Sequence, residues 1–129
     1  MHYSQLRTAV ESTLQSNSGE GEVLRVRMQG FISNEVLAAH LGELAARVER
    51  QAPMGILCDL RAIAGYDSRA SVLVREACML VRRAGIRRIA LVASSSVLRT
   101  HIRMLARDLD LELRCFLGQT EAARWLEST

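Results

Sequence analysis

Apolar and polar positions alternate with two different periods along the chain. Residues 22–28 alternate apolar with polar side chains, which is typical of a half-buried strand. After Gly30, Ser33 can cap a helix of period 3.6. The apolar stripe of that helix is Leu37, Leu41, Leu44 and Val48. Pro53 and Gly55 then break the helical pattern, so the sequence predicts a strand followed by an amphipathic helix.

The remainder of the chain repeats this strand-and-helix pattern. The short apolar runs 54–60, 88–93 and 111–116 suit strands that are buried on both faces of a parallel sheet. After a turn around Gly65, Asp67 is expected to cap a second helix, which Gly85 ends. Its expected core stripe is Leu73, Ala77, Leu80 and Ala84. A third helix is expected to follow with the stripe Leu98, Ile102, Leu105 and Leu109. Residues 119–127 are predicted to form a terminal helix.

This order of elements predicts an α/β fold in a single domain over residues 1–129. The sheet is expected to be mixed but mainly parallel, with four or five strands covered by about four helices. Residues 1–21 are the least determined part. Residues 3–10 fit either an edge strand or a short helix, and residues 16–21 fit a turn or loop.

Composition narrows the functional classes without naming one. The chain has 129 residues and a formal net charge of +3, and all 17 of its basic residues are arginine. Arginine usage reflects either base composition of the genome or selection for bidentate anion binding. Aromatic residues make up only 4 %, which disfavours stacking on single-stranded nucleic acid, so no nucleic-acid partner is expected. With no membrane span or signal peptide in the sequence, we expect a cytoplasmic protein.

Cysteine and histidine spacing gives no metal or disulfide pattern. Cys58, Cys78 and Cys115 are widely spaced, which fits reduced thiols. Cys58 and Cys115 lie in apolar strand runs and are expected to be buried and unbridged, whereas Cys78 is expected to be the more reactive thiol. No metal or cofactor is expected. Without a catalytic triad or paired carboxylates in a known motif, an enzyme is not expected either.

Two segments, residues 56–60 and 66–70, carry a resemblance to a known family. Ile56-Leu57-Cys58-Asp59-Leu60 followed by Tyr66-Asp67-Ser68-Arg69-Ala70 resembles the STAS domain, named for sulphate transporters and anti-sigma-factor antagonists. The segments RVRMQGFIS, GIRRIALVASS and RCFLGQTEAARWL are similar to the SpoIIAA-like bacterial branch. The resemblance covers about residues 22–127. It implies the STAS fold and a non-catalytic regulatory role through protein partners.

The chain departs from the family pattern at the position of the phosphate acceptor. In phosphoregulated members, the acceptor is the second serine of Asp-Ser-Ser-Gly, and that position holds Arg69 here. Ala70 replaces the glycine, and Ser68 matches only the first serine. We therefore expect no phosphate on Ser68, and we expect Arg69 to contribute to partner binding through its charge.

Candidate binding residues fall into three groups. Asp59, Asp67 and Ser68 are expected at the carboxyl end of one strand, where they either bind a ligand or satisfy caps and loop amides. Ser94, Ser95 and Ser96 follow the next strand, either as a phosphate site or as a helix cap. On the second helix, Val72 and Met79 lie beside Arg75, and this arrangement suits either an interface edge or a seam covered by neighbours.

The third helix presents a row of like charges. Arg99, Arg103 and Arg107 recur every four residues. They form either a solvated face or a surface opposite something acidic, such as a lipid headgroup, a protein partner, or Asp108 and Asp110. Val97 and Met104 repeat on this helix the apolar arrangement of the second helix.

Two functions fit these patterns. The first is a non-catalytic cytosolic regulatory module that works through protein partners or as a homodimer. The alternative is a carrier or sensor for a small apolar or phosphate-bearing ligand, similar in outline to SEC14-type folds. A carrier is expected to contain an apolar cavity of about 300 Å³ or more. An interaction module is expected to be packed solid and to expose an apolar seam.

Overall fold

A computed structural model describes residues 10–11 and 22–128, and in that part of the chain five strands form one sheet. The strands are β1 (Val10–Glu11), β2 (Val23–Ile32), β3 (Gly55–Tyr66), β4 (Arg88–Val92) and β5 (Glu112–Phe116). The helices are α2 (Asn34–Gln51), α3 (Ala70–Arg83), α4 (Ser96–Leu105) and α5 (Gln119–Glu127). The predicted α/β class with a mainly parallel sheet is confirmed.

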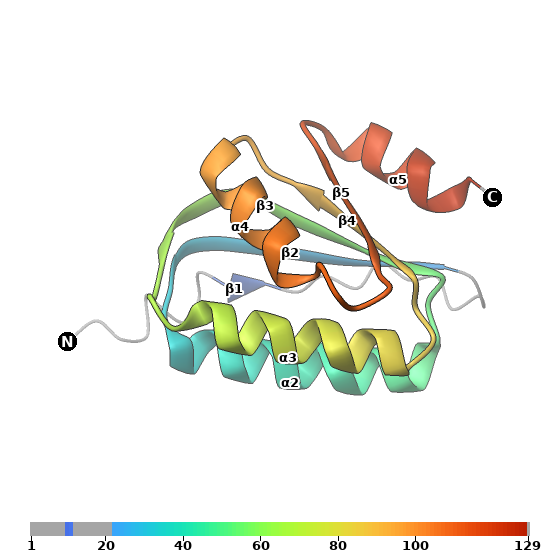
Figure 1. The fold of residues 1–129 in the computed structure, drawn as a ribbon, viewed down its shortest axis with the longest axis horizontal. Coiled ribbons are helices and arrows are strands. Elements are labelled where there is room, and N and C mark those ends of the chain that lie inside the picture. Colours follow the sequence, from blue (N-terminus) through green and yellow to red (C-terminus); the bar gives the residue numbers. More distant parts are fainter. Residues whose placement is uncertain (1–9, 12–21, 129) are drawn as a thin grey trace.

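The strands lie in the sheet in their order along the chain, β1 to β5. Strands β2 to β5 are parallel and β1 is antiparallel to β2. Right-handed crossovers between consecutive parallel neighbours place their helices on one face. Accordingly, α2 and α3 lie side by side along one face of the sheet and α4 is inclined to them, whereas α5 covers the opposite face (Figure 1).

Side-chain caps begin two of the helices as the sequence predicts. The Ser33 hydroxyl accepts a hydrogen bond from the Val36 amide at 3.2 Å, and the Ser95 hydroxyl accepts one from the Leu98 amide at 3.2 Å. Each bond satisfies one of the free donors of a helical first turn. After α3, Gly85 adopts φ +96°, a conformation that glycine tolerates and that ends the helix.

The sheet separates two apolar cores. The larger lies under α2, α3 and α4 and includes Leu24, Ile56 and Val81; the smaller lies under α5 and includes Leu57, Val92 and Leu126. Successive residues of a strand point to opposite faces, so Ile56 and Leu57 belong to different cores. Strands covered on both faces explain the continuous apolar runs in the sequence.

Strand β3 is longer than predicted. The expected turn at Gly65 is wrong, because β3 continues to Tyr66 and pairs with the second half of β2 through Gly65 opposite Phe31 and Tyr66 opposite Ile32. Two irregularities in this ladder, between Arg27 and Gln29 and between Gly30 and Phe31, interrupt the regular alternation. Because of these irregularities, the second half of β3 lacks the regular apolar–polar alternation by which a strand is recognised in a sequence.

Two predicted helix details are also wrong. The core side of α3 is centred on Ala70, Cys78 and Val81, while Leu80 of the expected stripe is 40 % exposed. Helix α4 ends at Leu105, so Leu109 and Arg107 lie beyond it. Of residues 1–21, only Val10–Glu11 is described, and it is a strand; the predictions for 3–9 and 16–21 lie outside the described residues.

Candidate functional site

An apolar cavity of about 420 Å³ lies between the sheet and helices α2, α3 and α4. Its walls are mainly aliphatic: Val26 and Ile56 come from the strands, Leu41 and Val74 from the helices, and Leu98 from α4. Most of these positions form the inner stripes that the sequence pattern assigned to the core. The structure therefore places an unfilled space where periodicity predicts packed side chains.

The polar lining of the cavity is concentrated where β3 leads into α3. Tyr66 ends β3, Ser68 lies in the short connection, and Ser71 lies in the first turn of α3. His101 of α4 joins them, since the Tyr66 hydroxyl and His101 Nδ1 are 3.2 Å apart. All four side chains are exposed, so this polar end is the mouth of the cavity.

Three residues of this mouth were not predicted from the sequence as site residues: Tyr66, Ser71 and His101. His101 lies three residues after Leu98 and one before Ile102, beside the inner stripe of α4, and this position was the available signal. Tyr66 was assigned to a loop because β3 was predicted too short. Contact between residues 66 and 101 depends on how α4 is placed over the sheet, which periodicity does not specify.

Asp67 was expected to be the capping residue of α3, but the capping position of this helix is Arg69. Asp67 Oδ1 accepts a 3.3 Å hydrogen bond from the amide of Arg69, and α3 begins only at Ala70. Arg69 occupies the capping position without a side-chain hydrogen bond. Ser68 and Arg69 are both exposed. The connection into α3 therefore presents a serine and an arginine to solvent beside the cavity mouth.

Asp59 does not belong to this end of the molecule. It points to the α5 face and is 4 % exposed, and Tyr66 follows seven positions later on β3, roughly 20 Å along the strand. Arg61 Nη2 and Gln119 Nε2 each donate to Asp59 Oδ2 at 2.8 Å, while the Arg61 amide donates to Oδ1 at 3.1 Å. The expected cluster of Asp59 with Asp67 and Ser68 is thus wrong.

These contacts make Asp59 a structural anion. The hydrogen bonds from the Arg61 guanidinium are the main cause that lowers the pKa of Asp59 to about 2, although burial opposes them. Gln119 lies in the first turn of α5, so the carboxylate ties that helix to the central strand. Asp59 therefore accepts its hydrogen bonds within the fold.

The serines after β4 act as a cap. Ser95 is the capping residue of α4, and Ser94 and Ser96 are exposed beside it. Cap geometry accounts for Ser95 fully; Ser94 and Ser96 remain candidates for anion binding on sequence grounds alone. None of the three lines the cavity described above.

The expected apolar seam on the outer side of the helices is partly observed. Val72 is 60 % exposed, and on α4 Val97 and Met104 are 66 % and 58 % exposed. Met79 is half-buried. Arg75 is directed toward α4, where its Nη1 donates to the carbonyl of Leu105 at 2.8 Å and joins the two helices.

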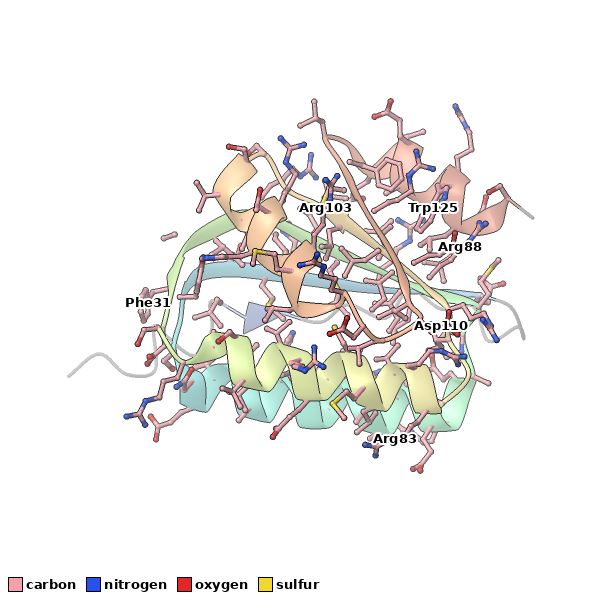
Figure 2. The ribbon with its side chains drawn as sticks, viewed as in Figure 1. Phe31, Arg83, Arg88, Arg103, Asp110 and Trp125 are labelled. Carbon is pink, nitrogen blue, oxygen red and sulfur yellow. The ribbon has the colours of Figure 1, made fainter. Side chains whose placement is uncertain are left out.

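The carboxylate of Asp110 does not pair with the arginines of α4. Arg82 of α3 and Arg87 contact Asp110 Oδ2 at 3.1 and 3.5 Å instead. In Figure 2, Asp110 lies near the C-terminal end of α3, away from Arg103 on α4. Among the described residues, no ion pair of Arg99 or Arg103 is found.

The thiols are free as predicted, but the predicted order of their burial is wrong. Cys78 is the buried cysteine at 5 % exposure, whereas Cys58 and Cys115 are half-buried. Burial is the first cause that raises the pKa of Cys58 to about 12 and also raises the pKa of Cys78. Cys78 faces the cavity rather than solvent, because the inner side of α3 is rotated from the predicted stripe.

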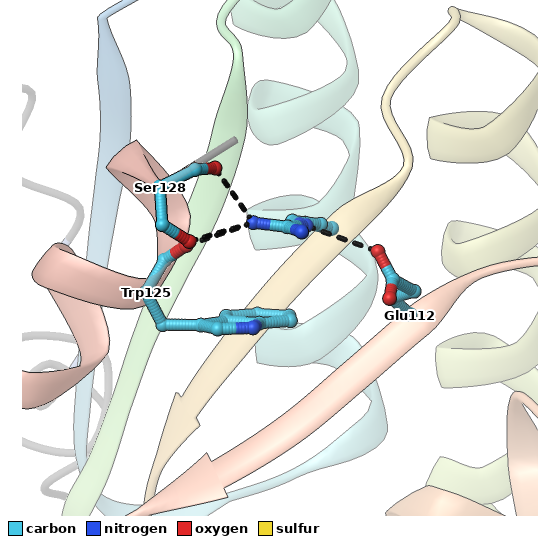
Figure 3. A network of polar contacts seen from close by, with 4 residues as sticks. Glu112, Trp125 and Ser128 are labelled. Carbon is cyan, nitrogen blue, oxygen red and sulfur yellow. Dashed lines mark hydrogen bonds and ion pairs between the residues drawn. The ribbon is translucent and has the colours of Figure 1, made fainter.

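The terminal helix is held by a network around Arg88. Arg88 Nη1 donates to the carbonyls of Trp125 and Ser128 at 2.9 Å, and Nε donates to Glu112 at 3.0 Å (Figure 3). The guanidinium also lies 4.9 Å from the centre of the Trp125 ring. Figure 2 shows Trp125 and Arg88 together on the α5 side.

Trp125 lies on α5 where this helix meets β5, an edge strand of the sheet. Helix α5 packs over the face of β3, β4 and β5, where Ala122 and Leu126 are the fully buried residues. Trp125 is half-buried and packs on Phe116 at a ring distance of 5.7 Å.

Metal and membrane features are not found in the described residues. No three His, Cys, Asp or Glu side chains within residues 10–11 and 22–128 are grouped to hold a metal ion. None of the helices in that part of the chain is both long and apolar enough to span a bilayer.

Comparisons with known proteins converge on one fold. A family model described as SpoIIAA-like matches residues 23–127. The structure of the anti-sigma factor antagonist SpoIIAA in its unphosphorylated form aligns with a TM-score of 0.70 at 13 % identity, over 94 % of this chain and 100 % of that chain. The phosphorylated form of the Bacillus cell fate determinant SpoIIAA aligns with a TM-score of 0.69 at 14 % identity, over 92 % and 100 %.

A third similar structure has no assigned function. An uncharacterised protein of the DUF3478 family with a SpoIIAA-like fold, from Shewanella loihica PV-4, aligns with a TM-score of 0.62 at 15 % identity over 92 % of both chains. No curated protein matches the sequence significantly. At these identities the solved structures support the fold, and the family model supports the membership.

Proposed function

The chain belongs to the SpoIIAA-like family, and on this premise we propose that it is a non-catalytic regulatory module that binds a small apolar ligand between its sheet and helices. The observation that carries the proposal is the cavity of about 420 Å³. Small-molecule sites are typically concave, largely apolar and about 300–1,000 Å³ in volume. The cavity therefore meets the criterion that separates a carrier or sensor from a solidly packed module.

The energetics of an empty cavity support an occupant. Residual cavities in protein cores cost about 24 cal/mol per Å³, so an unfilled space of this size would cost on the order of 10 kcal/mol. That figure is an upper limit because the mouth is open to water, but it is comparable to the whole stability of a small domain. An apolar ligand would recover much of it, since the walls offer few polar partners to water.

Binding is tested by filling the cavity from within. Ala77 lines the cavity on α3, whereas Ala46 of α2 is exposed and lies outside it. We expect the wild type and Ala46→Trp to bind the neutral apolar dye Nile red saturably, and Ala77→Trp to lose this binding while remaining folded by circular dichroism. Absence of saturable binding to the wild type, or full binding by a folded Ala77→Trp variant, would refute the proposal.

A protein partner is a second candidate, favoured by the exposure of Val72. This side chain is 60 % exposed one turn after Ser68 and Arg69, so the start of α3 offers an apolar contact beside a positive charge. The structural neighbour SpoIIAA is described as an anti-sigma factor antagonist. We propose that this surface of the chain contacts a regulatory protein, or a second copy of the chain, in the cytoplasm.

The partner surface is tested with charge and apolar variants. In a pull-down from the native host, Val72→Asp and Arg69→Ala are expected to lose partners that the wild type retains, without a change in melting temperature. Leu117→Asp is the matched control, since Leu117 is 66 % exposed and lies between β5 and α5, outside the apolar seam on α3 and α4. Equal recovery of the same partners by all variants would remove this surface from consideration.

A further inference from the structure

The cavity is apolar along its walls and polar only at its mouth, and from this asymmetry we propose that its ligand is a single-chain amphiphile with an anionic head group. This inference rests on the proposed function and specifies the chemistry of the ligand. The chain would lie among the aliphatic side chains, and the head would lie between the start of α3 and the middle of α4.

The side chains that line the mouth supply hydrogen-bond donors, and no carboxylate is among them, although Asp67 lies beside Ser68 in the chain and accepts from the Arg69 amide. The hydroxyls of Tyr66, Ser68 and Ser71 and the imidazole of His101 are the oxygen and nitrogen side chains that line the cavity. When the Tyr66 hydroxyl donates to His101 Nδ1, the Nε2–H of His101 is left as a donor for a ligand. Within residues 22–128, the Ser68 and Ser71 hydroxyls have no hydrogen-bond partner, so both can donate to an anion.

The helices at the mouth carry an excess of positive charge. Helix α4 has two arginines and no acidic residue, whereas Arg82 and Arg83 of α3 lie in its last turn, away from the mouth, where Arg82 pairs with Asp110. Neither helix has an acidic residue in its first turn, and α3 begins without a side-chain cap. Such a field raises the local concentration of anions and opposes a cationic head. Arg69, exposed before α3, adds to it.

The opposite end of the cavity excludes a second polar group. There the lining comes from Ala77 and Val81 of α3 and from Ile89 and Leu113 of the strands. A polar group buried among these side chains would have no hydrogen-bond partner and would cost several kcal/mol. One polar head and one apolar tail therefore match the cavity, whereas a ligand that is polar at both ends does not.

Three probes with the same ten-carbon chain test the inference: decanoate, decanol and decylammonium, each titrated calorimetrically below its micellar concentration. We expect decanoate to bind about ten-fold more tightly than decanol, and decylammonium to bind most weakly. Added salt is expected to reduce the preference for decanoate and to leave decanol unchanged, because only a charged head is screened.

Variants at the mouth locate the head. His101→Leu and Ser71→Ala are expected to bring the affinity for decanoate close to that for decanol, while Thr100→Leu, at an exposed position of α4 outside the cavity, keeps the preference. Equal affinities of decanoate and decanol for the wild type, or a preference unchanged in both mouth variants, would overturn the head-group assignment and leave the apolar site standing. Failure of all three probes to bind would refute the apolar site itself and the inference with it.

Discussion

Replacing Asp59 by asparagine is expected to destabilise the protein by an amount that depends on pH. The substitution keeps the shape of the side chain but removes the charge that accepts from Arg61 and Gln119. Lowering the pKa of a carboxyl group from 3.8 to about 2 on folding corresponds to about 2 kcal/mol of stability at neutral pH. This is an upper limit, because the Arg61 side chain is 45 % exposed and solvent screens the pair.

The direction of the pH dependence follows from linkage. The folded pKa of Asp59 lies below its unfolded value, so the stabilisation is complete above about pH 4 and is lost as the pH falls through about 2. Urea denaturation of wild type and Asp59→Asn, followed by circular dichroism at pH 7, 4, 3 and 2, measures the difference. We expect a difference of up to about 2 kcal/mol at pH 7 that shrinks below pH 4.

A control at Asp67 separates this effect from a general loss of charge. Asp67 accepts a single long hydrogen bond near the surface, so Asp67→Asn is expected to change stability by less than about 0.5 kcal/mol. If the difference between wild type and Asp59→Asn were the same at pH 7 and pH 2, the carboxylate of Asp59 would not hold α5 through its charge.

Four further predictions follow from burial and charge. Trp125→Ala is expected to lower stability by about 2 kcal/mol, less than for a fully buried tryptophan, and an unchanged melting temperature would contradict its packing on Phe116. Burial lowers the pKa of His40, and its Nε2 has no hydrogen-bond partner among the described residues. The wild type is therefore expected to lose stability as the pH falls below about 6.5. His40→Leu is expected to remove that loss, which melting curves at pH 8 and pH 5 measure. Cys58 and Cys78 are expected to react with a thiol reagent at least about 100-fold more slowly in native than in urea-denatured protein, and comparable rates would show the cavity side of α3 to be open. Phosphopeptide analysis of protein from the native host is expected to find no phosphate on Ser68, because the side chain that follows it, where the family carries its acceptor, is Arg69; substantial Ser68 phosphate would reverse this expectation.

Periodicity predicted those parts of the fold that regular alternation determines. The strands that became β4 and β5, the capped start of α2 and the parallel order all follow from local patterns and from the handedness of crossovers. The second half of β3 was missed because its pairing with β2 contains irregularities, so apolar and polar residues no longer alternate. That error placed Asp59 too close to Asp67 and Ser68, because a strand end was expected directly after Leu60.

The candidate site was harder to predict from the sequence than the fold, and for a different reason. A helical wheel shows that Leu98 and Ile102 face inward, but it does not show whether a neighbour fills the space they face. Likewise, Tyr66 and His101 are 35 residues apart, and only the placement of α4 brings them to 3.2 Å. A site that forms between two elements can be predicted only when the relative positions of those elements are known.

The position of α4 follows from the topology of the sheet, and with it the existence of the cavity. Three crossover helices share the face over β2 to β5, and neighbouring strands are about 4.8 Å apart, so the four strands span roughly 14 Å. Packed helices need about 8–10 Å between axes, so three of them need roughly 16–20 Å. Helix α3 packs closely on α2 and barely touches α4, which is inclined to both (Figure 1). The space left beneath α4 is the polar-mouthed end of the cavity, so the site is a consequence of consecutive parallel strands and needs no dedicated loop to build it.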